Sequence, residues 1–137
     1  VVPEKDFFAL SNSGGTKCSS AYKVALEHIV EFHPASGWNL YLFHFSDGDN
    51  LPYDNDVCKT IVENLLVQCN MVGYGEIRYR DAASFYSGTV TPYAPSTLQY
   101  TLQQISHRRL LSVTITQKEE LYQVLQSFLQ PKGAVAV

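Results

Sequence analysis

Asn39-Leu-Tyr-Leu-Phe-His-Phe-Ser-Asp-Gly-Asp-Asn50 is the most informative stretch of this chain. Its first seven residues are almost continuously apolar or aromatic, which is typical of a strand covered on both faces in a parallel sheet. A turn rich in carboxylates, residues 46–50, follows that strand at once. Ligands of open α/β sheets bind outside the carboxyl ends of the strands, so this turn is the first candidate for a functional site.

Helical and extended patterns alternate on both sides of this stretch. Four helices are predicted, over residues 18–31, from Asp54 or Asn55 to about Cys69, over 97–105 and over 118–129. Two further strands are predicted, over residues 71–79 and 110–115. Residues 81–95 are rich in Ser, Gly, Thr and Pro and are predicted to form a long loop. This alternation predicts an α/β three-layer sandwich with a mainly parallel sheet.

Helical spacing of apolar residues indicates which helix positions face the core. The expected inward positions are Ala21, Val24, Ala25, Ile29 and Phe32 in the first helix, Val57, Ile61, Leu65 and Leu66 in the second, and Leu121, Val124, Leu125 and Phe128 in the last.

Composition limits the possible classes of protein. The 137 residues are enough for one domain, and 45% apolar with 17% charged residues excludes a compositionally disordered chain. A net charge of −3 argues against general binding to nucleic acid or to anionic membranes. No apolar run is long enough for a membrane helix. Three cysteines without CxxC spacing favour a reducing cytoplasm.

Carboxylates gather in one region without compensating charge. Between Lys23 and Lys59 there is no lysine or arginine, whereas the interval contains Glu27, Glu31, Asp47, Asp49, Asp54 and Asp56. Such a cluster either remains solvated or holds a hard cation. Turn formation and helix capping account for Asp49, Asp54 and Asp56. Asp47 is the functional candidate, because it directly follows a buried strand and precedes a glycine.

A second candidate motif precedes the first helix. Ser13-Gly14-Gly15-Thr16 combines glycines, which let the backbone approach a ligand closely, with a hydroxyl oxygen at Thr16. The same residues could simply cap the helix. The motif is not a Walker P-loop, because no Gly-Lys-Ser/Thr follows it. Alone, this motif is a weak indication of a binding site. It becomes specific only together with the Ser-Asp-Gly turn that follows the next strand.

Three motifs then occur in order: Ser13-Gly14-Gly15-Thr16-Lys17-Cys18-Ser19-Ser20-Ala21-Tyr22, His44-Phe45-Ser46-Asp47-Gly48-Asp49-Asn50 and Met71-Val72-Gly73-Tyr74-Gly75-Glu76-Ile77. With Phe7-Phe8 and the last helix, they resemble the bacterial YeaH/YhbH family over about residues 7–128. This family resembles von Willebrand A domains, is associated with sporulation and stress responses, and is commonly encoded beside an atypical serine protein kinase.

The resemblance implies a partial von Willebrand A-like, Rossmann-like α/β fold with a metal-ion-dependent adhesion site. Thr16 and Asp47 match the metal positions of such a site, and the expected cation is Mg²⁺. The residues expected to support the metal site or to contact a partner are Ser13, Gly14, Gly15, His44, Asp49 and Asn50.

One part of the adhesion site is not in this sequence, namely an Asp-x-Ser-x-Ser run at the end of an earlier strand. Family members carry that run upstream, so the resemblance implies that residues 1–137 form one domain, the carboxyl-terminal part of a von Willebrand A-like domain. The chain would supply about two of five metal-shell groups, and we expect weak or absent Mg²⁺ binding. The absent strand would neighbour Leu40–Phe45, which predicts an exposed strand edge and a homodimer.

The expected function is therefore a cytoplasmic protein-interaction module without catalysis of its own, with a protein partner such as the serine protein kinase. The alternative is a metal-dependent hydrolase or phosphotransferase that uses the Asp47–Asp56 carboxylate cluster. An enzyme needs a nucleophile or base beside that cluster. The start of a helix predicts a lowered pKa for Cys18, yet the sequence offers it no His–Asp pair.

Overall fold

The computed structural model describes residues 17–78 and 97–129. In chain order the elements are α2 (Cys18–Phe32), β1 (Tyr41–Ser46), a 3₁₀ turn η1 (Pro52–Asp54), α3 (Asn55–Gln68), β2 (Met71–Ile77), α5 (Leu98–Gln103), β3 (Leu110–Ile115) and α6 (Glu120–Leu129). The predicted alternation of helices and strands is confirmed. The predicted loop over 81–95 lies outside the described residues.

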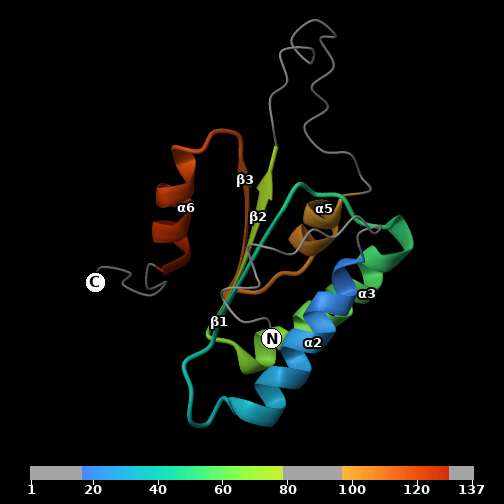
Figure 1. The fold of residues 1–137 in the computed structure, drawn as a ribbon, viewed down its shortest axis with the longest axis vertical. Helices are drawn as coiled ribbons and strands as arrows, with labels where there is room; N and C mark the ends of the chain where they lie inside the picture. The colour runs from blue at the N-terminus through green and yellow to red at the C-terminus, as the bar shows by residue number, and fades with distance from the viewer. Residues whose placement is uncertain (1–16, 79–96, 130–137) are drawn as a thin grey trace, which may run out of the picture.

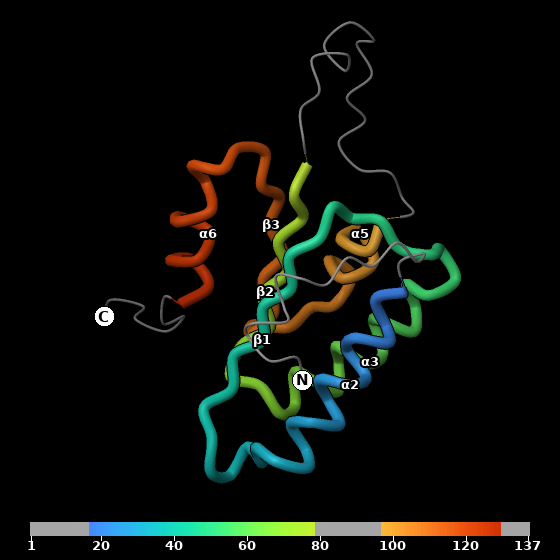
Figure 2. The backbone as a smooth tube through the Cα atoms, in the orientation of Figure 1, coloured from blue at the N-terminus to red at the C-terminus, as the bar shows by residue number. Residues whose placement is uncertain are grey.

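The three strands form one parallel sheet in the order β1-β2-β3. Figure 1 shows α6 on one face of this sheet and α2, α3 and α5 on the other. The mixed α/β class and the parallel sheet are therefore confirmed. Because the three strands are parallel, their carboxyl ends lie on the same side of the sheet, as the tube in Figure 2 shows. The connections that follow β1, β2 and β3 therefore all begin on that side.

Glycines make room for aromatic rings on the face of the sheet that α6 covers. Gly73 and Gly75 of β2 lie beside Phe43 and Phe45 of β1, and Phe128 of α6 stacks on Phe43 with ring centroids 5.5 Å apart. A Cβ atom at position 73 would come within 2.8 Å of the Phe128 ring and 2.9 Å of the Phe43 ring. The glycines of the Met71–Ile77 strand are therefore required by packing between the sheet and α6.

The main core lies on the opposite face of the sheet. Its buried residues come from α2, α3, β2 and α5, and they are Cys18, Tyr22, Cys58, Val62, Leu65, Leu66, Cys69, Val72, Tyr74, Leu98 and Leu102. Part of the predicted inward set is wrong, because Val24, Phe32, Val57 and Leu121 are 58%, 55%, 47% and 40% exposed. Leu65, Leu66 and Phe128 of the predicted set are buried, as expected. Tyr22, Cys58 and Val62 also belong to the buried residues of α2 and α3, so the buried stripes of these two helices differ in part from the expected ones.

The turn between α2 and β1 exposes an aromatic group. Trp38 is 54% exposed and packs edge-on against His33, with ring centroids 4.7 Å apart. His33 in turn lies 5.2 Å from the ring of His28. These contacts order the turn without joining it to the core.

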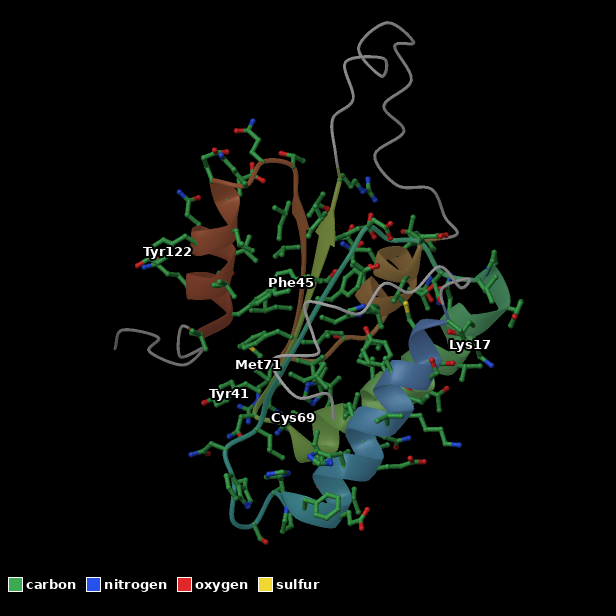
Figure 3. All side chains as sticks on the ribbon, viewed as in Figure 1. Lys17, Tyr41, Phe45, Cys69, Met71 and Tyr122 are labelled. Carbon is green, nitrogen blue, oxygen red and sulfur yellow. The ribbon has the colours of Figure 1, made fainter. Side chains whose placement is uncertain are left out.

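β1 forms the edge of the described sheet. Within residues 17–78 and 97–129, it pairs with β2 alone. Tyr41, its first residue, is 52% exposed, and Figure 3 shows its side chain extending away from the sheet. None of the helices in the described ranges is long and apolar enough to cross a membrane.

We predict that Gly73→Ala lowers the free energy of unfolding by about 1–3 kcal/mol, because the new methyl group overpacks against the Phe128 and Phe43 rings. Gly37→Ala is the matched control, since its Cβ would lie 3.9 Å from the nearest atom, the Pro34 carbonyl oxygen. Urea denaturation measures both variants. Equal stabilities of the two variants would contradict the packing role of Gly73.

Candidate functional site

A tight turn places Asp47 directly after β1. The Asp47 Oδ1 atom accepts a hydrogen bond from the Asp49 amide at 3.0 Å, and the Gly48 amide donates to Ser46 Oγ at 3.1 Å. Gly48 has a φ of +89°, a conformation that favours glycine. Asp47 and Asp49 are both exposed. The functional candidate of the sequence therefore stands at the carboxyl end of a strand, as expected.

The rest of this turn holds the amino end of α2. The Cys18 amide donates to Asn50 Oδ1 at 3.0 Å, and the Ser19 amide donates to Asp54 Oδ2 at 2.9 Å. The Ser19 hydroxyl donates to the other oxygen of Asp54. Two of the amides that a helix start leaves without helical partners are thus bound by side chains more than thirty positions away.

Asp54 therefore has a different role from the predicted one. It was expected to make a turn or to cap its own helix, but its side chain makes no capping hydrogen bond to α3. Instead it is fully buried and caps α2, the preceding helix. Asn50 is also buried, and its Nδ2 atom donates to Asn55 Oδ1 at 2.8 Å. Both side chains serve the architecture of the turn.

These contacts set the protonation of two groups. Burial alone would raise the pKa of Asp54, but hydrogen bonds from Ser19, Cys58 and Asn50 outweigh burial and lower the pKa. Burial raises the pKa of Cys18, and the charges of Asp54, Asp47 and Asp49 raise it further. The expected lowered pKa of Cys18 is wrong, and its thiol stays protonated at neutral pH.

The acidic residues do not gather into one cluster. Asp47 and Asp49 lie in the turn, Asp54 faces α2, and Asp56 is exposed in the first turn of α3. In the described part of the chain, no group of three or more His, Cys, Asp or Glu side chains is placed to hold a metal ion. Ser13, Gly14, Gly15 and Thr16 lie outside the described residues. Thr16 directly precedes Lys17, which stands at the start of α2 (Figure 3).

His44 lies in β1 on the core side of the sheet. Its Nδ1 atom is 2.6 Å from the Tyr22 hydroxyl of α2, and its ring packs edge-on against Tyr22 and Tyr74. Burial lowers the pKa of His44, so the ring is neutral at pH 7 and its Nδ1 atom can accept a hydrogen bond from the Tyr22 hydroxyl. His44 thus joins α2 to β1, the strand that directly precedes Asp47.

Glu76, near the end of β2, was not among the predicted site residues. The residue is 1% exposed, stands next to Ser46 in the sheet and pairs with Arg78 through Oε1. Burial raises the pKa of Tyr74, two residues earlier, and the charge of Glu76 raises it further. The available signal was an acidic residue inside an otherwise apolar strand, in Met71-Val-Gly-Tyr-Gly-Glu-Ile77.

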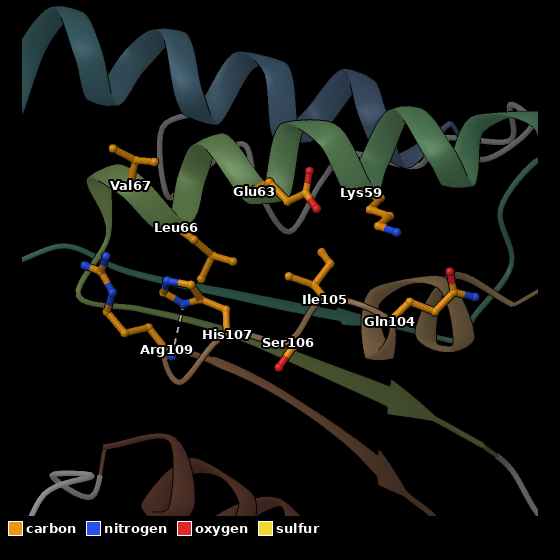
Figure 4. Close-up of a pocket in the computed structure, with 9 residues that line it drawn as sticks. All are labelled: Lys59, Glu63, Leu66, Val67, Gln104, Ile105, Ser106, His107 and Arg109. Carbon is orange, nitrogen blue, oxygen red and sulfur yellow. Dashed lines mark hydrogen bonds between the residues drawn. The ribbon is translucent and has the colours of Figure 1, made fainter.

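A separate cavity of about 310 Å³ lies between α3 and the segment that leads into β3 (Figure 4). It is lined by Lys59, Glu63, Leu66, Val67, Gln104, Ile105, Ser106, His107 and Arg109. Arg109 is engaged there, because its Nη1 atom donates to the Cys69 carbonyl and its amide donates to His107 Nδ1. His107 and Arg109 precede β3, so this cavity reaches toward the amino ends of the strands, away from Asp47.

The fold and the turn define a parallel α/β protein with a polar site at the strand ends. The family model described as "Protein of unknown function (DUF444)" matches residues 1–132. The chain belongs to this family, in agreement with the YeaH/YhbH resemblance of its motifs.

Two bacterial proteins illustrate the similarity. A UPF0229 protein of Bacillus thuringiensis (strain Al Hakam) is 39% identical over 97% of this chain, and one of Shouchella clausii is 41% identical over 99%. The chain spans only 31% and 32% of the lengths of these two relatives. No solved structure matches the chain.

We predict that Asp54→Asn lowers the free energy of unfolding at pH 7 by about 1–3 kcal/mol, because it weakens the acceptor for the Ser19 amide and hydroxyl. Since the folded protein lowers the pKa of Asp54, its stabilising contribution is present above the unfolded value of about 3.9 and is lost as the pH falls through the lower folded value.

Chemical denaturation of both proteins between pH 7 and pH 3 measures this difference. The stability difference between wild type and Asp54→Asn should narrow below about pH 4, where the Asp54 carboxylate of the unfolded chain begins to protonate while that of the folded protein is still ionised. Asp56→Asn, at an exposed position of α3, should leave the stability within about 0.5 kcal/mol. A gap that stays constant across this pH range would contradict the assigned role of Asp54.

Proposed function

We propose that this chain is part of a von Willebrand A-type protein-interaction module. Its strand-end surface would bind a protein partner through a partial metal-ion-dependent adhesion site formed by Thr16 and Asp47. The proposal includes the signalling context of the family resemblance, bacterial stress or sporulation with a serine protein kinase as partner. Because the chain spans about a third of its relatives, the function concerns the longer protein.

The exposed carboxylate of Asp47 at the carboxyl end of a parallel strand is the observation that supports this proposal most. The turn uses Oδ1 of Asp47 as a hydrogen-bond acceptor and leaves the carboxylate exposed to solvent. The same turn binds the amino end of α2 through Asn50 and Asp54. Thr16 is therefore adjacent in sequence to a segment that is fixed beside the Asp47 turn.

The donor chemistry of these residues fits a hard cation. Carboxylate and hydroxyl oxygens are the ligands that Mg²⁺ prefers, and Mg²⁺ is commonly held by one or two carboxylates with water or a partner's oxygens completing its shell. In the proposed site, Thr16 and Asp47 would hold Mg²⁺ and an acidic side chain of the partner would bind it. We expect the isolated chain to bind Mg²⁺ or Mn²⁺ with a Kd no tighter than about 1 mM.

The alternative of a hydrolase or phosphotransferase has less support. Its carboxylate cluster would need Asp47, Asp54 and Asp56 to act together, yet Asp54 is buried against Ser19 and Asp56 faces solvent on α3. The raised pKa of Cys18 also weakens it as a nucleophile beside this turn. The interaction module is therefore the function that we propose.

We predict that Asp47→Asn in the full-length protein weakens kinase binding at least tenfold while changing the melting temperature by less than about 2 °C. Asparagine keeps the acceptor for the Asp49 amide and removes only the charge that a cation needs. Thr16→Ala should have the same effect. Biolayer interferometry with Mg²⁺ present measures binding, and Asp56→Asn is the control for loss of one negative charge.

Two results would count against this function. Unchanged binding by both Asp47→Asn and Thr16→Ala would exclude these residues from the partner surface. Unfolding of both variants, with binding per folded molecule intact, would assign them a structural role instead.

We further propose that the edge of β1 pairs with a second copy of the chain. Unpaired strand edges recruit other strands, and a two-fold dimer is the simplest closed arrangement. Sedimentation of the 137-residue chain at micromolar concentration should show a dimer. Tyr41→Lys, which puts a charge on the exposed edge, should shift it toward monomer, whereas Tyr122→Lys, at a 70% exposed position of α6, should not. A monomer at high concentration would contradict this pairing.

A further inference from the structure

The cavity between α3 and the segment that leads into β3 brings three basic side chains together. Lys59, His107 and Arg109 line it, and Glu63 is the one acidic residue of its lining. The chain as a whole carries a net charge of −3, so a concave surface with this excess of basic groups differs from the average of the chain. Its volume of about 310 Å³ lies at the lower end of the range of small-molecule sites.

Arg109 presents an edge of its guanidinium group that lacks an acceptor. Its Nη1 atom donates to the Cys69 carbonyl at 2.9 Å, which fixes the plane of the group. Its Nε atom is buried and has no hydrogen-bond partner among residues 17–78 and 97–129. The Nε and Nη2 groups share the edge that Nη1 does not belong to, and such a pair binds both oxygens of a carboxylate or phosphate. A buried charged donor without a partner is costly, so this edge calls for an acceptor.

His107 adds a second donor at the same end of the cavity. Its Nδ1 atom accepts a hydrogen bond from the Arg109 amide at 3.2 Å, which is the dashed line in Figure 4. An imidazole whose Nδ1 atom accepts carries its proton on Nε2, so Nε2 is a donor. The ring is exposed, and Nε2 can therefore donate to an oxygen of a bound ligand.

The middle of the cavity is apolar. In Figure 4, Lys59 lies at one end and His107 and Arg109 at the other, with Leu66 between them. Leu66 is buried and Ile105 is half-buried, and both line the cavity. A ligand that fills this space therefore combines an acidic group with a hydrocarbon part.

The charges at the other end limit the ligand to one negative charge. Lys59 is half-buried and makes no ion pair in the described part of the chain, so its ammonium group attracts an anion into the cavity. Glu63, four residues later on α3, is exposed and lines the same space. Its carboxylate repels a doubly charged phosphate ester more than a singly charged carboxylate.

We propose that this cavity is a binding site for a small organic carboxylate. The carboxylate group lies on the Nε–Nη2 edge of Arg109 and accepts a hydrogen bond from Nε2 of His107, and the hydrocarbon part packs against Leu66 and Ile105. The site is independent of the proposed interaction surface, because the cavity reaches toward the amino ends of the strands, away from Asp47.

Binding of 4-fluorobenzoate to the full-length protein, followed by fluorine NMR, tests this inference. The wild type should bind this probe with a Kd of about 1 mM or tighter. Arg109→Lys keeps the positive charge but removes the paired N–H groups, and it should raise the Kd about tenfold. Arg108→Lys is the matched control, because Arg108 is exposed and does not line the cavity, and it should change the Kd less than about twofold.

Two further measurements make the test independent of folding of Arg109→Lys. Lys59→Gln leaves the Cys69 contact of Arg109 intact and should raise the Kd about threefold through loss of one charge. The neutral probe 4-fluorobenzamide should not bind, because it lacks the negative charge. Circular dichroism and the melting temperature establish that each variant is folded.

Several outcomes would overturn the assignment. Wild-type affinity in both Arg109→Lys and Lys59→Gln, or in Lys59→Gln alone if Arg109→Lys does not fold, would exclude the cavity as the site. Equal binding of 4-fluorobenzamide, or no binding of 4-fluorobenzoate by the wild type at about ten times the expected Kd, would also do so. Tighter binding of 4-fluorophenyl phosphate than of 4-fluorobenzoate would overturn the choice of a carboxylate as the ligand.

Discussion

The carboxylate of Asp54 on the amino end of α2 is the interaction on which the rest of the strand-end surface depends. A helix start presents amides without helical partners, and Lys17, at the position before α2, provides no side-chain cap. Asp54 and Asn50 supply the acceptors from the β1–α3 connection. The same short segment therefore ends one strand, begins one helix and anchors another, which places residues far apart in the sequence around one turn.

The two faces of the sheet divide stability and chemistry between them. Toward α6, the strands present Phe43, Phe45 and the two glycines of β2, with the ring of Phe128 stacked among them. Toward the other helices, the amino half of the sheet is apolar and the carboxyl half carries His44, Ser46, Tyr74 and Glu76 in register. Polar side chains are thus concentrated where parallel strands end, and the apolar packing that carries them lies elsewhere.

The sequence predicted the order of elements well, because strands such as Leu110–Ile115 and helices such as Asn55–Gln68 carry local signals. The sequence was a poorer guide to which side chains contact one another in the folded chain. Val24 and Phe32 fit an apolar stripe but face solvent, since the core of α2 is set by Tyr22 meeting His44. Asp54 looked like a cap for its own helix, and Glu76 did not stand out. The role of Asp54 arises from its contact with Ser19 in a distant segment, which no local spacing encodes.

The single tryptophan of the chain has a practical consequence for spectroscopy. Trp38 lies on the α2–β1 turn, more than half exposed and against an imidazole ring, and it does not belong to the core cluster. Its emission in this chain reports on the solvent around the α2–β1 turn more than on the melting of the interior. The buried tyrosines, Tyr22 and Tyr74, provide the optical signal of the folded core, and near-ultraviolet dichroism of their rings follows the packing between α2 and the sheet.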